Sequence, residues 1–79
     1  MPTDEQISSA IALALKHFRS QRNFSQIYLS ENSGIHRTMI EKIETSKRKP
    51  TYHTLIKLCS VLEITVSEFS EVVEKNLKF

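Results

Sequence analysis

The side chains best suited to chemistry in this sequence are few and far apart. The three histidines, His17, His36 and His53, are spaced too widely for a local metal motif, and no HExxH pattern or Cys/His cluster occurs. Cys59 is the only cysteine, which excludes an internal disulfide and a multi-cysteine zinc site. We therefore expect no metal and no cofactor, and we interpret Cys59 as a small buried hydrophobic residue.

Catalytic groups are also missing from the pattern. An enzyme would need a nucleophile beside a base, paired carboxylates in a cleft, or a glycine-rich loop that cradles phosphate. The nearest approach is Glu41 and Glu44, which lie three residues apart on one predicted helix. The sequence therefore predicts a protein that is not an enzyme.

Positive charge is concentrated in the middle of the chain. The formal net charge is only +2, yet residues 16–57 hold nine of the 11 Lys and Arg residues and only three of the nine acidic ones. A basic segment between acidic ends suits the binding of a polyanion on one face. Taken alone, such a cluster is as often a solvated surface, so the charge pattern leaves both interpretations open.

Membrane insertion and export are not indicated. The apolar run that includes residues 11–15 is followed by Lys16, and no apolar run is long enough to cross a bilayer. Asp4 and Glu5 stand where a secretory signal would carry positive charge. We expect a cytoplasmic protein.

The elements that position the polar and charged side chains are predicted to be helices. Gly34 is the only glycine and Pro2 and Pro50 are the only prolines, so tight hairpins are improbable, and 79 residues suffice for one domain. The apolar spacing predicts an all-α fold, a compact bundle of five helices. The predicted helices cover about residues 4–22, 26–32 and 37–45, a fourth that begins after Thr51, and a fifth that opens at Thr65 or Ser67 and reaches about residue 78.

Each predicted helix has an apolar face. Thr3, Ser25 and Thr51 can serve as N-caps, and Asn23 can end the first helix. The predicted buried positions, in helix order, are Ile7, Ile11, Ala14, Leu15 and Phe18; Leu29 and part of Tyr28; Ile35, Ile40 and Ile43; Leu55, Leu58, Cys59 and Leu62; and Phe69. The last predicted helix also carries Val66, Val72, Val73 and Leu77 at its apolar positions.

The second and third predicted helices are joined by a short turn that contains Gly34, the residue best able to adopt a positive φ. Two short helices joined in this way are typical of a helix-turn-helix. The second helix of such a unit must protrude far enough for its outward side chains to enter a major groove, so inner residues must lock the pair together. Leu29, Ile35, Ile40 and Ile43 can supply that lock.

A longer pattern extends this motif on both sides. Its parts are Phe24-Ser25-Gln26, Leu29, Ser33-Gly34-Ile35, Ile40 to Glu44, Lys47 to Thr51, and Leu55 to Leu62. With these residues the chain resembles the Cro/repressor (Xre) type of helix-turn-helix domain, a lambda-repressor-like DNA-binding domain, over about residues 11–70. The length and the segment from Ser33 to Thr38 most resemble the controller proteins of restriction-modification systems, which are free-standing dimers.

Four positions depart from the family pattern. Asn23, Ser46 and Glu63 stand where the family commonly has glycine, and Ser30 stands where it has alanine. Asn23 can adopt the backbone conformation of glycine. The other changes affect the expected loop geometry, and not the expected fold.

The resemblance implies a division of labour on the DNA. It places Arg37, Thr38 and Lys42 on the face that meets base edges in the major groove. Arg37 could bond a guanine bidentately, and Thr38 could touch a thymine methyl group or a phosphate. It assigns Glu44 to a structural role near the end of the third helix. For Met39 two alternatives stay open, packing beneath the helix or contact with a thymine methyl group.

The remaining DNA contacts would be made to the sugar-phosphate backbone. The resemblance places Ser25 and Gln26 at the start of the second helix, and gives Gln26 both a phosphate contact and a brace against the recognition helix. His36 would cap the third helix or reach a phosphate. The loop residues Lys47, Arg48 and Lys49 would supply affinity and salt dependence more than sequence choice.

The last predicted helix, about residues 66–78, carries apolar residues that could pair two copies of the chain. The candidate dimer interface consists of Val72, Val73, Leu77 and Phe79, although the helix could simply cover another side of the core.

We expect residues 1–79 to form one domain of a protein of prokaryotic or phage origin. As a homodimer, it would bind a palindromic operator in double-stranded DNA and repress or activate transcription. No small-molecule ligand is expected. The alternative is an antitoxin or an adaptor that uses the same fold to hold a protein.

Overall fold

A side-chain N-cap starts every helix of the computed structural model, which describes residues 1–77. The helices are α1 (Asp4–Gln21), α2 (Gln26–Ser33), α3 (Arg37–Glu44), α4 (Tyr52–Leu62) and α5 (Val66–Lys75). Their caps are Thr3, Ser25, His36, Thr51 and Thr65, each of which accepts a hydrogen bond from a backbone N–H of the first turn. The predicted all-α fold is confirmed, and the predicted ends of the first three helices are correct to within one residue.

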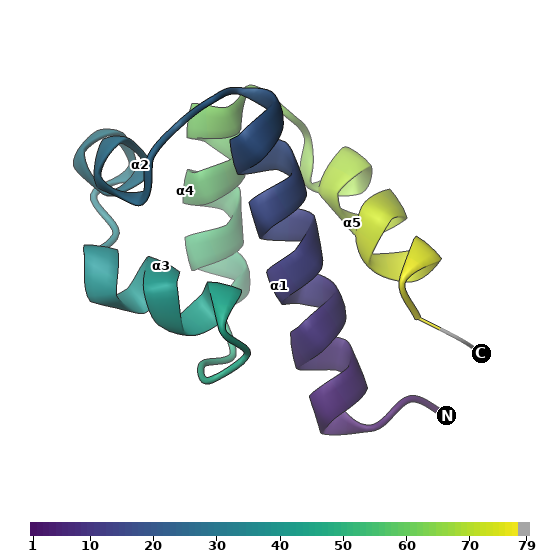
Figure 1. The fold of residues 1–79 in the computed structure, drawn as a ribbon. Coiled ribbons are helices and arrows are strands. Elements are labelled where there is room, and N and C mark those ends of the chain that lie inside the picture. The colour runs from purple at the N-terminus through teal and green to yellow at the C-terminus, as the bar shows by residue number, and fades with distance from the viewer. Residues whose placement is uncertain (78–79) are drawn as a thin grey trace.

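The long helix α1 has neighbouring helices on two sides (Figure 1). α1 packs against α5 on one side and against α3 on the other, while α2 contacts both α3 and α4. The core between them contains the apolar residues Ala14, Leu15, Leu29, Ile40, Ile43, Leu58, Cys59, Leu62 and Phe69. The pair formed by α2 and α3 therefore stands on a scaffold made by the other three helices.

The structure corrects the prediction at one core residue and at one helix end. Ile7 is 38% exposed and lies in the N-terminal part of α1, the part that extends beyond the start of α4 (Figure 1). The last helix ends at Lys75 and not near residue 78. Asn76 ends it, since its side-chain amide donates to the carbonyl oxygen of Val72 at 2.9 Å and its backbone N–H bonds within the last turn.

A residue with positive φ lies one or two positions beyond the end of each of the first four helices. They are Asn23 (φ 56°), Gly34 (φ 75°), Ser46 (φ 63°) and Glu63 (φ 57°). A side chain in this left-handed region costs about 1–2 kcal/mol. The three positions where the family commonly has glycine thus keep the glycine conformation in spite of their Cβ atoms. At Gly34 a Cβ atom would meet nothing within 4 Å, so glycine is suited there by its φ and not by lack of space.

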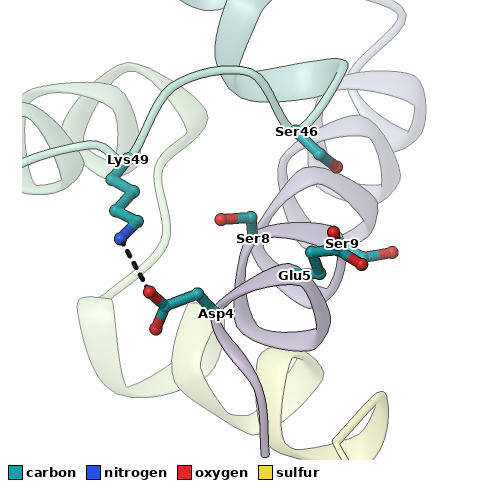
Figure 2. Close-up of a pocket in the computed structure, with 6 residues that line it drawn as sticks. All are labelled: Asp4, Glu5, Ser8, Ser9, Ser46 and Lys49. Atoms are coloured by element: carbon teal, nitrogen blue, oxygen red, sulfur yellow. Dashed lines mark hydrogen bonds and ion pairs between the residues drawn. The ribbon is translucent and has the colours of Figure 1, made fainter.

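One exposed ion pair joins the start of α1 to the loop between α3 and α4 (Figure 2). The Nζ atom of Lys49 lies 3.2 Å from a carboxylate oxygen of Asp4, and both side chains are largely exposed. An open hollow of about 470 Å³ lies beside this pair, lined by Asp4, Glu5, Ser8, Ser9, Ser46 and Lys49. Exposed pairs of this kind contribute little stability.

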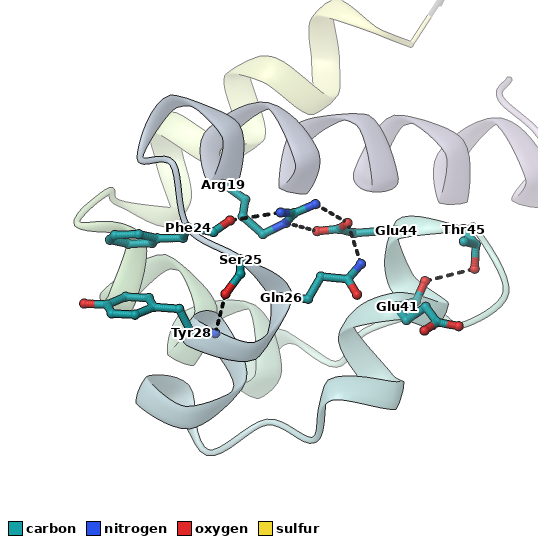
Figure 3. Close-up of polar contacts among 8 residues, drawn as sticks. All are labelled: Arg19, Phe24, Ser25, Gln26, Tyr28, Glu41, Glu44 and Thr45. Carbon is teal, nitrogen blue, oxygen red and sulfur yellow. Dashed lines mark hydrogen bonds and ion pairs between the residues drawn. The ribbon is translucent and has the colours of Figure 1, made fainter.

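A second ion pair is buried and joins α1 to the end of α3 (Figure 3). Arg19 donates from Nε and from a terminal nitrogen to the two carboxylate oxygens of Glu44, at 2.7 and 2.9 Å. Its other terminal nitrogen donates to the carbonyl oxygen of Phe24 at 2.9 Å. The Gln26 amide adds a third donor to Glu44, at 3.0 Å. These hydrogen bonds tie α1, the start of α2 and the end of α3 together.

The environment of this pair is asymmetric. The Glu44 side chain is only 4% exposed and the Arg19 side chain 20%. The hydrogen bonds to Glu44 raise the pKa of Arg19 above its ordinary value, so the guanidinium stays charged. A carboxylate at this depth depends on its donors, because an uncompensated buried charge is strongly destabilising. The structural role assigned to Glu44 is confirmed.

The variant Arg19→Met should lower the free energy of unfolding by about 3 kcal/mol, because it leaves the buried Glu44 carboxylate without its cation. Chemical denaturation measures the loss. The matched control is Lys49→Met, which breaks the exposed pair and should cost less than about 1 kcal/mol. Adding Glu44→Met to Arg19→Met should restore part of the loss. Equal effects of the two single variants would contradict this account.

Cys59 is buried in the core, as predicted, with 2% of its surface exposed. Burial raises the pKa of its thiol to about 11, with a smaller contribution from Glu68. Alkylation requires the thiolate. We expect iodoacetamide at pH 8 to react with the folded protein at least about tenfold more slowly than with the urea-unfolded protein. Equal rates in the two states would contradict the burial of this thiol.

Candidate nucleic-acid interface

The unit formed by α2 and α3 has the predicted inner lock. Leu29 of α2 and Ile40 and Ile43 of α3 are fully buried, and Ile35 between the helices packs against the same core. Burial of these side chains fixes the angle between the two helices, so the opposite face of α3 points away from the protein. The predicted lock is thus confirmed.

The reading face of α3, defined as Arg37, Thr38, Glu41 and Lys42, is exposed to solvent. These residues recur at i, i+4 spacing, on the side of the helix opposite the buried isoleucines. Glu41 belongs to this exposed face although it is not among the predicted DNA contacts, and its place on the same helical stripe could have indicated this. Arginine and carboxylate side chains on such a face can distinguish guanine and cytosine by their hydrogen-bonding groups.

The start of α3 is fixed by a histidine cap. His36 accepts a hydrogen bond at Nδ1 from the backbone N–H of Thr38, at 3.1 Å. Of the two alternatives for Met39, the structure supports packing, because this side chain is half-buried against the hydrophobic core. Arg37 and Thr38 therefore project from a capped and packed first turn.

The turn that precedes α3 contains bonds that the sequence did not suggest. The Ser30 hydroxyl donates to the carbonyl oxygen of Ile35 at 2.6 Å, and the Ile35 N–H donates to the Ser33 hydroxyl at 3.1 Å. The sequence marks Ser30 only as a departure from alanine, and Ser33 only as part of the family pattern. Local sequence gives no sign of which way a serine hydroxyl points.

Ser25 and Gln26 lie at the start of α2, and Gln26 contacts the last residue of α3. Ser25 caps the helix by accepting from the Tyr28 N–H at 2.9 Å, and Gln26 reaches Glu44 as already described (Figure 3). The predicted brace from Gln26 to the recognition helix is therefore present. Its phosphate contact stays a prediction.

The basic loop, Lys47, Arg48 and Lys49, is exposed next to α3. A backbone hydrogen bond of 2.8 Å from Lys47 N–H to the Lys42 carbonyl holds the start of the loop against α3. In residues 1–77, Lys49 is the one member of the loop that pairs with a carboxylate. Lys47 and Arg48 are thus better placed than Lys49 to meet a phosphate without first losing a protein partner.

The candidate dimer residues are only partly available for pairing. Val72 and Val73 are half-buried and pack against the core of their own chain, so they are needed there more than the sequence suggested. Leu77 is half-buried beyond the end of α5. Phe79 lies outside the described residues. A pairing role for this end of the chain stays a prediction.

Other kinds of site find no support in the part of the chain that the structure describes. Across residues 1–77, no three His, Cys, Asp or Glu side chains gather closely enough to hold a metal ion. Over the same range, no helix combines the length and the apolar character needed to cross a membrane.

Comparison with known proteins places this geometry in a family. Residues 15–69 match the family model HTH_3, described as helix-turn-helix. The chain is 38% identical over 60 residues to the control protein C.SmaI of Serratia marcescens, covering 76% of this chain and 71% of that protein. It is 32% identical over 65 residues to the transcriptional regulator SutR of Escherichia coli K12, covering 82% of this chain and 36% of SutR.

A solved complex is similar over nearly the whole chain. The structure of C.Esp1396I bound to a 19 base pair DNA duplex superimposes with a TM-score of 0.83 at 29% identity, covering 91% of this chain and 97% of that one. The resemblance to controller proteins is confirmed by these relatives, and so is the expectation of a regulator instead of an enzyme. The chain belongs to the HTH_3 helix-turn-helix family of DNA-binding transcriptional regulators.

Proposed function

We propose that this protein binds an inverted-repeat operator as a homodimer in the cytoplasm and regulates transcription from it, with α3 of each copy in the major groove. The observation that carries the proposal is the reading face of α3, which is exposed and capped while its opposite face is buried. An exposed polar helix face on a rigid base is what direct readout of base edges requires.

The roles on this face follow from side-chain chemistry. Arg37, at the first position of α3, suits bidentate hydrogen bonding to guanine, and Glu41 one turn later suits the amino group of cytosine. Lys47 and Arg48 on the basic loop suit phosphate contacts, which supply affinity and salt dependence without sequence information. Base reading and backbone binding are thus assigned to separate elements.

The relatives support the proposal of more than one copy on one operator. C.Esp1396I occurs as a tetramer with its natural 35 base pair operator and also bound to a 19 base pair duplex. A duplex of 19 base pairs is long enough for two half-sites separated by about one helical turn of 10–10.5 base pairs. We infer the same kind of symmetric site for this chain.

The experiment that tests the function first selects bound sequences from a random DNA pool, which defines the operator. Arg37→Ala should then weaken operator binding by about 1–3 kcal/mol and relax the preference at one base pair in each half-site, as measured by fluorescence anisotropy on single-base operator variants. Equal weakening on every sequence would show that Arg37 contacts phosphate and not a base.

Lys47→Ala is the matched comparison for Arg37→Ala on the basic loop. It should weaken binding to operator and unrelated DNA alike and reduce the slope of log K against log salt by about one for each copy bound. If the unmodified protein bound DNA weakly and without salt dependence, the regulator proposal would fail, and the protein-binding adaptor would be the better account.

Dimer formation has its own test at the end of α5. Leu77→Ser should raise the dimer dissociation constant about tenfold if Leu77 is one of the few anchors that carry the interface, because only such residues cost more than about 1 kcal/mol when they are truncated. Sedimentation equilibrium measures the change. Lys75→Ser, an exposed neighbour, is the control and should have little effect. A protein that remained monomeric at all concentrations, with or without operator, would overturn the homodimer.

A further inference from the structure

Two serine side chains hold the turn between α2 and α3 at one residue, Ile35. Ile35 receives the Ser30 hydroxyl on its carbonyl oxygen at 2.6 Å, and its N–H donates to the Ser33 hydroxyl at 3.1 Å. Both backbone polar groups of Ile35 are therefore bonded to side chains of α2. Its own side chain packs against the core, so this residue is restrained in three directions.

The direction of the Ser30 hydroxyl is unusual for a residue inside a helix. Serine in a helix commonly bonds back to the carbonyl of the preceding turn or points to solvent. Ser30 instead reaches forward five residues, across Gly34, while its backbone carbonyl accepts from the Gly34 N–H at 3.0 Å. Ser30 thus holds two successive residues of the turn, and alanine at this position could make only the backbone bond.

The residues that the two bonds to Ile35 position come next in the chain. His36 follows Ile35 and caps α3, and Arg37 is the first residue of that helix. The cap conformation of His36 is defined by φ −58° and ψ 137°. A rotation of the peptide planes on either side of Ile35 would move the cap and, with it, the first turn of the reading face.

We propose that Ser30 and Ser33 are positioning residues for DNA reading. By holding Ile35, they fix where Arg37 and Thr38 enter the major groove. Bidentate contacts to base edges need close alignment, whereas phosphate contacts tolerate small displacements. The two serines therefore act on sequence discrimination and not on general affinity for DNA. This inference rests on the proposed function of α3.

The DNA-binding test compares Ser30→Ala with Ser20→Ala, which removes an exposed hydroxyl from α1. Operator affinity of Ser30→Ala should fall about three- to tenfold, the equivalent of one hydrogen bond. Affinity for unrelated DNA and the salt slope should stay unchanged, so the specificity ratio falls by the same factor. Ser20→Ala should leave all three quantities unchanged. A Ser30→Ala protein with an unaltered specificity ratio, or with equal losses on both DNAs, would overturn the inference.

A second measurement needs no DNA. Amide hydrogen exchange should show Ile35 exchanging about tenfold faster in Ser33→Ala than in the unmodified protein, because its acceptor is gone. The amide of Leu58 in the core of α4 reports global stability and should be unaffected. An unchanged exchange rate at Ile35 would show that the Ser33 hydroxyl does not hold the turn. If the unmodified protein failed to discriminate its operator, the proposed function would fail, and the exchange result would still decide whether the serines hold the turn.

Discussion

The buried contact between Arg19 and Glu44 is the interaction on which the rest of the arrangement depends. A carboxylate that is 4% exposed requires strong donors, and here they come from α1 and from the start of α2. Because Glu44 is the last residue of α3, satisfying its charge also fixes the position of that helix. The guanidinium further bonds the Phe24 carbonyl, so the connection into α2 is held by the same side chain.

This contact separates the rigid and the adaptable parts of the molecule. Behind α3, the buried isoleucines and the ion pair join it to the scaffold of α1, α4 and α5. In front, the reading face and the basic loop carry polar side chains in solvent, most of them long. Such a division suits DNA recognition, since a fixed helix gives base contacts their geometry while flexible lysine and arginine side chains adjust to phosphates.

The difference between the predicted and the observed burial of Ile7 has a physical reason. Helical periodicity correctly identifies the apolar face of each helix, but it does not say where neighbouring helices begin and end. Ile7 continues the apolar stripe of α1 and is nevertheless exposed. Val72 and Val73, whose pairing role stays a prediction, are half-buried against the core of their own chain. Burial depends on the lengths and angles of the packed helices, which a one-dimensional pattern does not contain.

Sequence by itself determined the local structure of this protein. N-cap residues, apolar spacing and Gly34 define where the helices start, which faces are apolar and where the chain turns, because these effects act within one or two turns of helix. Tertiary structure alone decided which distant polar groups meet. Arg19 and Glu44 are 25 residues apart, and Asp4 and Lys49 are 45 apart. Their pairing follows from how the helices pack, and the direction of the Ser30 hydroxyl follows from the path of the turn that this packing allows.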